Sequence, residues 1–230
     1  MLKKFDEQIQ KLKTRLIKMG SLVEEQLNLA INAINTDNAE ICNKIFEDEN
    51  LVDKIDLKIE KDCQKLFALN QPVALDLRLI ISAINLSTDL ERIGDLAKNI
   101  AEKFLKTKRK PEFIDSTNFS EMAKTALTML KDALDSFIYS DVEKAKQVIL
   151  NDKILDELNI ENDKKLIEIM QQNPSYIEQA VDYLDICHQL ERCGDHATNV
   201  AEDVFFISEA NIIKHKYEKF IFNDEEGVDD

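Results

Sequence analysis

The chain has 230 residues, enough for roughly one or two domains, and only 4 of them are glycine and 3 are proline. So few chain-breaking residues argue against an all-β fold, which needs frequent turns, and against nucleotide enzymes whose phosphate loops need glycine. The net charge of −15 disfavours binding to nucleic acid and adhesion to an anionic membrane surface. The hydrophobic content of 44% is still sufficient for a folded core.

Apolar residues recur at alternating spacings of three and four from residue 2 to residue 34, which predicts a long first helix. After a polar break with capping residues, a second apolar stripe runs from Cys42 to Leu66. We place Pro72 in the first turn of a third helix, which runs to about Lys106. The first half of this third helix is apolar on nearly all sides, so we expect neighbouring helices to enclose it on most sides.

Residues 108–117 form the best boundary in the chain, because they contain Pro111 and a group of basic residues. The helical pattern then restarts, and three more helices are predicted. They cover residues 118–139, 141–172 and 175–209. The expected fold is therefore all-α, with six long helices arranged as two homologous antiparallel three-helix bundles. The predicted units are residues 1–110, residues 111–222 and an acidic tail at residues 223–230.

The N-terminal decapeptide MLKKFDEQIQ contains acidic residues that interrupt any apolar run, so it does not have the pattern of a secretory signal. The longest uncharged apolar stretch, residues 79–88, is shorter than the roughly 20 residues of a membrane-spanning helix. We therefore expect a cytoplasmic protein that does not insert into a membrane. Its cysteines have no C-x-x-C spacing and are expected to be reduced and mostly buried. They are Cys42, Cys63, Cys187 and Cys193.

An internal repeat supports the division into two units. Residues 90–102 read LERIGDLAKNIAE and residues 190–202 read LERCGDHATNVAE, so nine of thirteen positions are identical at an offset of 100. Each copy has a glycine in mid-helix, which costs about 1 kcal/mol relative to alanine. The simplest reason for Gly94 and Gly194 is the close approach of another helix backbone.

The repeated segment gathers polar oxygens on one helical face, opposite the apolar face. A solvated acidic surface would explain one such face, but like charges one turn apart repel, so residue-by-residue repetition favours a function. Carboxylates one turn apart are good oxygen ligands for a hard or borderline cation. We hypothesise that each unit binds metal on this face. The candidate ligands are Glu91, Asp95, Asn99, Glu191, Asp195 and Asn199.

Several other groups leave two interpretations open. A fainter match at an offset of 103 relates Glu49 and Asp53 to Asp152 and Asp156, in the preceding helix of each unit. These acids can supply further metal ligands or form a solvated surface with local salt bridges. His188 precedes Glu191 by three residues, and it can join the second site or be an ordinary polar histidine.

Enzyme functions are disfavoured because the chain contains no GxSxG, P-loop, HExxH or kinase signature. A ferritin-like di-iron oxidase needs Glu-x-x-His on two helices of one bundle. The only near match is Asp185-x-x-His188, and the first repeat lacks it. A carboxylate-bridged metal-storage or di-iron-type bundle is the alternative class of function, and a helical scaffold without metal is a third.

The segments DLRLIISAINLSTDLERIGDLAKNIAE (76–102) and HQLERCGDHATNVAE (188–202) resemble the paired signatures of the PhoU family, whose members regulate phosphate transport and the phosphate regulon. The resemblance covers nearly the whole chain and implies a cytoplasmic, all-helical protein that is often dimeric and is not an enzyme. It also implies metal clusters at the surface motifs Glu91–Asp95 and Glu191–Asp195, with Asn99 and Asn199 following less directly. Iron or zinc clusters are the expected cofactors, with magnesium or manganese as alternatives.

The same resemblance implies the partners. When phosphate is plentiful, family members restrain a phosphate ABC importer, which we expect them to contact through its ATPase subunit. They also keep the sensor histidine kinase of the phosphate two-component system in its repressing state. The resemblance thus implies a switchable, metal-binding adaptor that forms a homodimer. The negative net charge independently indicates that it does not bind nucleic acid.

Overall fold

The computed structural model describes residues 2–107 and 109–209, and in this part of the chain six long α-helices and three short 3-10 helices occur without any β-strand. The long helices are α1 (Leu2–Thr36), α2 (Cys42–Asn70), α3 (Ala74–Thr107), α4 (Phe119–Tyr139), α5 (Val142–Gln172) and α6 (Ile177–Glu209). The 3-10 helices are η1 (Ala39–Ile41), η2 (Ile114–Ser116) and η3 (Pro174–Tyr176). The all-α prediction is confirmed, while the expected acidic tail at 223–230 lies outside the described residues.

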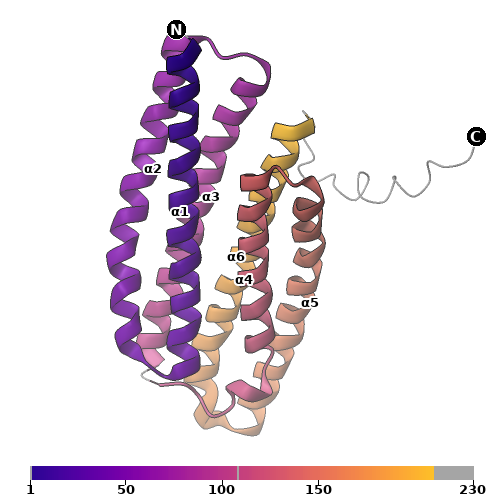
Figure 1. Cartoon of the computed structure of the whole chain (residues 1–230). Coiled ribbons are helices and arrows are strands. Elements are labelled where there is room, and N and C mark those ends of the chain that lie inside the picture. The colour runs from indigo at the N-terminus through magenta and orange to yellow at the C-terminus, as the bar shows by residue number, and fades with distance from the viewer. Residues whose placement is uncertain (1, 108, 210–230) are drawn as a thin grey trace, which may run out of the picture.

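The helices form two antiparallel three-helix bundles that lie side by side (Figure 1). Helices α1, α2 and α3 pack against one another, and so do α4, α5 and α6. The two bundles meet mainly where α3 packs against α6, and α1 contacts α4 less extensively. The third helix of each repeat therefore lies at the centre of the molecule, and the second helix of each repeat, α2 or α5, lies at the outside.

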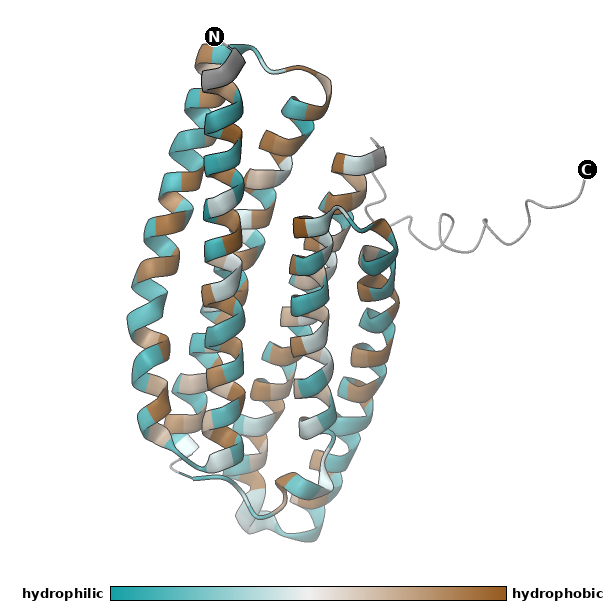
Figure 2. Ribbon diagram, viewed as in Figure 1, coloured by the Kyte–Doolittle hydropathy of each residue, from teal (hydrophilic) through white to brown (hydrophobic). Residues whose placement is uncertain are grey.

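Apolar stripes hold the bundles together, and Figure 2 shows hydrophobic and hydrophilic residues alternating along each helix. On α1, for example, Leu12, Leu16, Met19, Val23 and Leu27 are fully buried. Burying an aliphatic side chain of this size contributes about 1.5–3 kcal/mol, so the stripe is a major source of stability. It also fixes which polar residues face outward.

The start of α3 differs from the sequence prediction. The helix begins at Ala74 rather than at Pro72, because Gln71 and Ala74 adopt left-handed backbone conformations with φ of 46° and 48°. Leu75 is 54% exposed, so the expected enclosure of this first turn is wrong. In Figure 1 the first bundle extends beyond the ends of α4 and α5, which leaves this end of α3 partly uncovered. Full burial begins about one turn later, at Ile80.

The four cysteines are buried free thiols, as predicted. Burial raises the pKa of the Cys187 thiol to about 12, which keeps it protonated and unreactive. None of the helices in the described residues is long and apolar enough to cross a membrane.

Candidate metal centre

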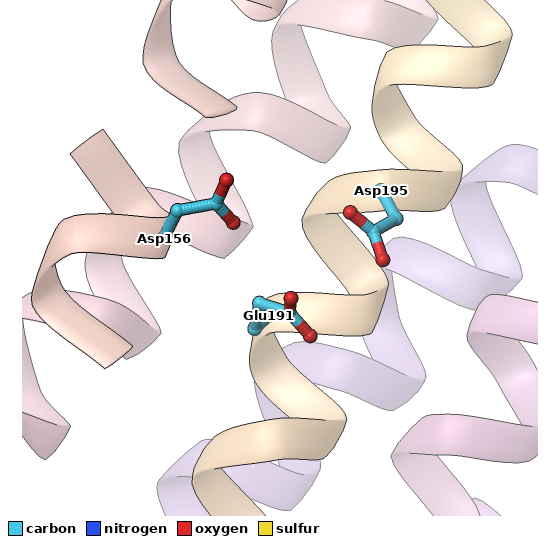
Figure 3. Close-up of side chains that lie close together, drawn as sticks. All are labelled: Asp156, Glu191 and Asp195. Carbon is cyan, nitrogen blue, oxygen red and sulfur yellow. The ribbon is translucent and has the colours of Figure 1, made fainter. Parts of the chain in front are cut away.

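Three carboxylates converge between α5 and α6 in the second repeat. Glu191 and Asp195 lie one turn apart on α6, and Asp156 faces them from α5 (Figure 3). Each residue offers one carboxylate oxygen, and these oxygens lie within 4.8 Å of one another. We call Asp156, Glu191 and Asp195 the carboxylate trio. The helical wheel predicted the pair on α6, and the neighbouring helix supplies the third oxygen.

The trio concentrates negative charge in a partly desolvated place. Burial, followed by the charges of Asp195 and Asp156, raises the pKa of Glu191 to about 7. Burial is also the main cause of the raised pKa values of Asp156 and Asp195. A cation would relieve both effects, because it neutralises the repulsion and replaces lost water as a partner of the oxygens.

Asp152 adds a fourth carboxylate to this region. It lies one turn before Asp156 on α5, and its pKa rises to about 6 because of burial, the charge of Asp156 and the charge of Asp195. Its Oδ1 is buried, and a side-chain hydrogen bond from Thr198 of α6 partly offsets the rise in pKa. A cation would add a further partner for this buried carboxylate, which therefore fits the same site. The oxygen-rich donor set suits hard or borderline metals.

The first repeat brings together the corresponding residues of α2 and α3. Glu49 is only 7% exposed, and burial, partly offset by a hydrogen bond from Gln26, raises its pKa to about 7; Asp95 also contributes to the rise. Burial and then the charge of Asp95 raise the pKa of Glu91, with smaller effects from Asp56 and Asp53. Acids of α2 therefore face acids of α3, as the pairing of the two motifs suggested. Within the described ranges, however, only the second repeat holds three carboxylates as close together as the trio.

The two asparagines lie in different surroundings. The side-chain amide of Asn199 donates to Asp89 Oδ1 at 3.0 Å, so it turns toward α3. Asp89 also contacts His196 Nδ1 at 2.8 Å. Asn99, the equivalent of Asn199 in the first repeat, is exposed. Metal ligation by Asn99 and Asn199 stays a prediction from sequence.

Two flanking charges modify the sites without belonging to them. His188 Nε2 lies 3.2 Å from Asp163 Oδ1, so this histidine has a carboxylate partner outside the trio. In the first repeat Arg92 lies 3.7 Å from Asp95, and its exposed guanidinium partly offsets the local negative charge. Of the two interpretations of His188, the ordinary polar histidine describes its contacts best.

Sequence reasoning missed one buried polar side chain beside the first site. Gln26 of α1 is fully buried and donates to Glu49 Oε2 at 3.0 Å. Its signal was a polar residue among the apolar residues of the first helical stripe. The expected close approach of another helix backbone at the two mid-helix glycines is wrong, because the atoms nearest to both glycines belong to side chains. A Cβ at Gly94 would lie 3.1 Å from Gln26 Oε1, and a Cβ at Gly194 would lie 2.5 Å from a methyl carbon of Leu155.

Comparison with known proteins agrees with this architecture. The family model described as the PhoU domain matches twice, at residues 16–104 and 119–204. A PhoU homologue from Aquifex aeolicus, a phosphate-specific transport system accessory protein, is 34% identical over 94% of this chain and 98% of its own. A homologue from Thermotoga maritima with the same description is 32% identical over 98% of this chain and 97% of its own.

Solved structures give the same result. The crystal structure of PhoU from Pseudomonas aeruginosa superposes with a TM-score of 0.86 at 30% identity, covering 90% of this chain and 100% of that one. The phosphate transport system regulatory protein PhoU from Streptococcus pneumoniae superposes with a TM-score of 0.82 at 28% identity, covering 90% and 98%.

Proposed function

The chain belongs to the PhoU domain family, and from this membership we propose that it is an accessory regulator of phosphate transport. In the fuller proposal it lowers phosphate uptake and represses phosphate-starvation genes when phosphate is plentiful. It does so in the cytoplasm as an adaptor without catalytic activity. The support is the repeated domain match together with relatives whose names describe them as accessory proteins of phosphate-specific transport.

The observation that carries the metal part of the proposal is the convergence of Asp156, Glu191 and Asp195. These oxygens, with Asp152 beside them, would hold a hard or borderline cation, for which we propose iron or zinc, with magnesium or manganese as alternatives. Glu91, Asp95 and Glu49 would do the same in the first repeat. The bound metal would supply positive charge at two otherwise acidic surfaces.

This change of charge is the proposed switch for partner binding. The chain carries a net charge of −15, so its metal-free acidic surfaces repel an acidic partner. Metal would let these surfaces approach acidic protein surfaces or phosphate. The proposed partners are the ATPase subunit of a phosphate ABC importer, a phosphate-sensing histidine kinase and a second copy of the chain.

The metal-storage or di-iron alternative has less support. A di-iron oxidase of the ferritin type uses histidine together with carboxylates, but His188 is paired with Asp163 and lies outside the trio. Adding ferrous iron and oxygen to the protein and measuring iron oxidation tests this alternative directly. Sustained turnover would favour it over the adaptor.

Deletion of the gene in its native host tests the regulatory function. Starvation genes should stay active in phosphate-rich medium after deletion, and a wild-type copy should restore repression. A Glu191→Gln, Asp195→Asn copy should be expressed and folded yet restore repression poorly, because it lacks two carboxylates of the trio. If deletion leaves expression in rich medium unchanged, the regulatory proposal is wrong. If the double variant restores full repression, the metal switch is wrong and the regulatory role stands.

A further inference from the structure

The two repeats differ in the side chain that packs beside the mid-helix glycine of the metal motif. The nearest groups to Gly94 are Gln26, Glu49 and Val52, and those nearest to Gly194 are Leu155 and Met129. Val52 and Leu155 are related by the offset of 103 residues that relates Glu49 to Asp152. The same offset relates Gln26 to Met129, so a hydrogen-bond donor in one repeat is replaced by a thioether in the other.

Gln26 is held in one orientation. Its side chain is fully buried, and its amide nitrogen donates to the main-chain oxygen of Ile45 at 3.2 Å and to Glu49 Oε2 at 3.0 Å. Both partners are acceptors, so the nitrogen rather than the oxygen must face them. The opposite orientation would place the amide oxygen against these two acceptor oxygens, so the contact favours the observed one, although it leaves the buried Oε1 without a hydrogen-bond partner among the described residues.

This hydrogen bond determines how Glu49 presents its carboxylate. Gln26 binds Oε2, and the Glu49 carboxyl also interacts with Asp95 of the metal motif. Gln26 therefore anchors Glu49 at one oxygen, in a position from which the carboxyl meets Asp95 of the metal motif. Met129 has no N–H and cannot anchor Asp152 in this way. The side-chain hydrogen bond to the Asp152 carboxyl comes instead from Thr198 of α6.

We propose that Gln26 is a positioning residue that orients Glu49 as a metal ligand, and that it makes the two repeats bind metal with different affinities. This role rests on the proposed metal binding, and it would explain why the metal affinities of the two repeats differ. Donors that fix metal ligands typically change metal affinity by about 10–100-fold when they are removed. Gln26 does not itself touch the cation; it acts through Glu49.

Calorimetric titration of the full chain with Zn²⁺ alone measures the affinity of one repeat at a time when the motif carboxylates of the other repeat are replaced. The Glu191→Gln, Asp195→Asn background leaves only the first repeat able to bind. In it, Gln26→Met should weaken Zn²⁺ binding by about 10–100-fold. The exposed Gln10→Met, on the same helix, is the matched control and should change nothing.

The reciprocal exchange keeps the proposal testable if Gln26→Met folds poorly. In the Glu91→Gln, Asp95→Asn background only the second repeat binds, and there Met129→Gln should strengthen Zn²⁺ binding. Equal affinity in Gln26→Met and Gln10→Met, or no gain from Met129→Gln, would overturn the role of Gln26 while leaving metal binding intact. If the wild-type chain binds no more Zn²⁺ than the variant lacking all four motif carboxylates, the proposed metal function fails, and this inference fails with it.

Discussion

Asp89 of α3 and His196 of α6 lie 2.8 Å apart, from the carboxylate Oδ1 to the ring Nδ1, across the contact between the two repeats. The same oxygen accepts a hydrogen bond from Asn199 at 3.0 Å. The Asp89 and His196 side chains are only 15% and 21% exposed, so solvent screens the contact weakly. The positions that correspond by the offset of 100 are Gln189 and Leu96, which cannot form this contact because leucine has no polar group. The contact therefore has no counterpart at the positions that the repeat relates to it, unlike the carboxylate motif itself.

Replacing Asp89 by alanine should destabilise the protein. The change leaves His196 and Asn199 without their shared acceptor at partly buried positions, which typically costs about 1–3 kcal/mol. For a chain of this size each kcal/mol lowers the melting temperature by about 2–4 °C. Thermal unfolding followed by circular dichroism measures the loss.

Asn99→Ala is the matched control for this prediction, because Asn99 is the exposed equivalent of Asn199 in the first repeat. It should change the melting temperature by no more than a surface substitution normally does, within about 0.5 kcal/mol. If Asp89→Ala and Asn99→Ala melt at the same temperature, the contact across the repeats contributes nothing measurable.

Replacing Glu191 by glutamine should have opposite effects with and without metal. In the metal-free protein the change removes a charge that Asp195 and Asp156 repel, so the melting temperature should rise by a few degrees, corresponding to about 1 kcal/mol. Zn²⁺ at 100 times its dissociation constant should raise the free energy of unfolding of the wild-type chain by about 2.7 kcal/mol. The variant should lose the part of this stabilisation that comes from metal bound at the trio.

Scanning calorimetry of both proteins with chelator and with Zn²⁺ provides the comparison. Glu121→Gln is the contrasting variant, because it removes an exposed carboxylate in the first turn of α4, where the helix N-terminus favours a negative charge. It should lower the melting temperature slightly. A Glu191→Gln variant that is less stable than wild type in chelator would show that Glu191 contributes favourable contacts rather than repulsion.

The sequence carried enough information to predict the helices and the carboxylate faces, because both depend on spacing along one segment. Glu191 and Asp195 share a face of α6 for that reason, and the wheel places them correctly. The partner of Asn199 could not be predicted in this way. Asp89 precedes it by 110 residues, and only the packing of α3 against α6 brings the two together.

The role of Gln26 was hidden for a related reason. The apolar stripe of the first helix passes beside Gln26 at Val23 and Leu27, but the acceptors of its amide, Ile45 and Glu49, belong to α2. Periodicity gives the face that a residue occupies and not the neighbour that it meets. The start of α3 was misplaced because two non-glycine residues, Gln71 and Ala74, adopt left-handed conformations that their types seldom favour.

The metal-free protein should become more stable as the pH falls from about 8 to about 5.5. In the folded chain the pKa values of Glu49 and Glu191 are raised to about 7 and that of Asp152 to about 6. In the unfolded chain these groups titrate near pH 4, so in this window the folded state binds more protons. Stability then rises with falling pH, and the gain ends once the unfolded state is protonated as well.

Urea unfolding in chelator at several pH values tests this, and Zn²⁺ should reverse the trend. Protons compete with metal for the carboxylates, so the metal-loaded chain should lose stability over the same pH range. Glu191→Gln removes one of the responsible groups and should flatten the slope in chelator. A metal-free chain whose stability is constant or falls toward pH 5.5 would contradict the burial of these carboxylates.

The two mid-helix glycines should respond differently to alanine. A Cβ at Gly194 would lie 2.5 Å from Leu155 and 3.3 Å from Met129, so core side chains must shift, and overpacking of this kind costs about 1–3 kcal/mol. Alanine also favours the helix by about 1 kcal/mol, which offsets part of this cost. At Gly94 the nearest atom is 3.1 Å away, so the clash is smaller and the helix gain offsets more of it.

Urea unfolding of the metal-free proteins should therefore rank Gly94→Ala as the more stable variant. For Zn²⁺ binding by the first repeat, Gly94→Ala should instead be the more damaging of the two variants. Its new methyl group presses on the Gln26 amide that anchors Glu49. Gly94→Ala should weaken binding there, whereas Gly194→Ala should leave that repeat unchanged, because its new contacts are Leu155 and Met129 of the second bundle. Equal stability of the two variants would mean that Leu155 moves aside without cost.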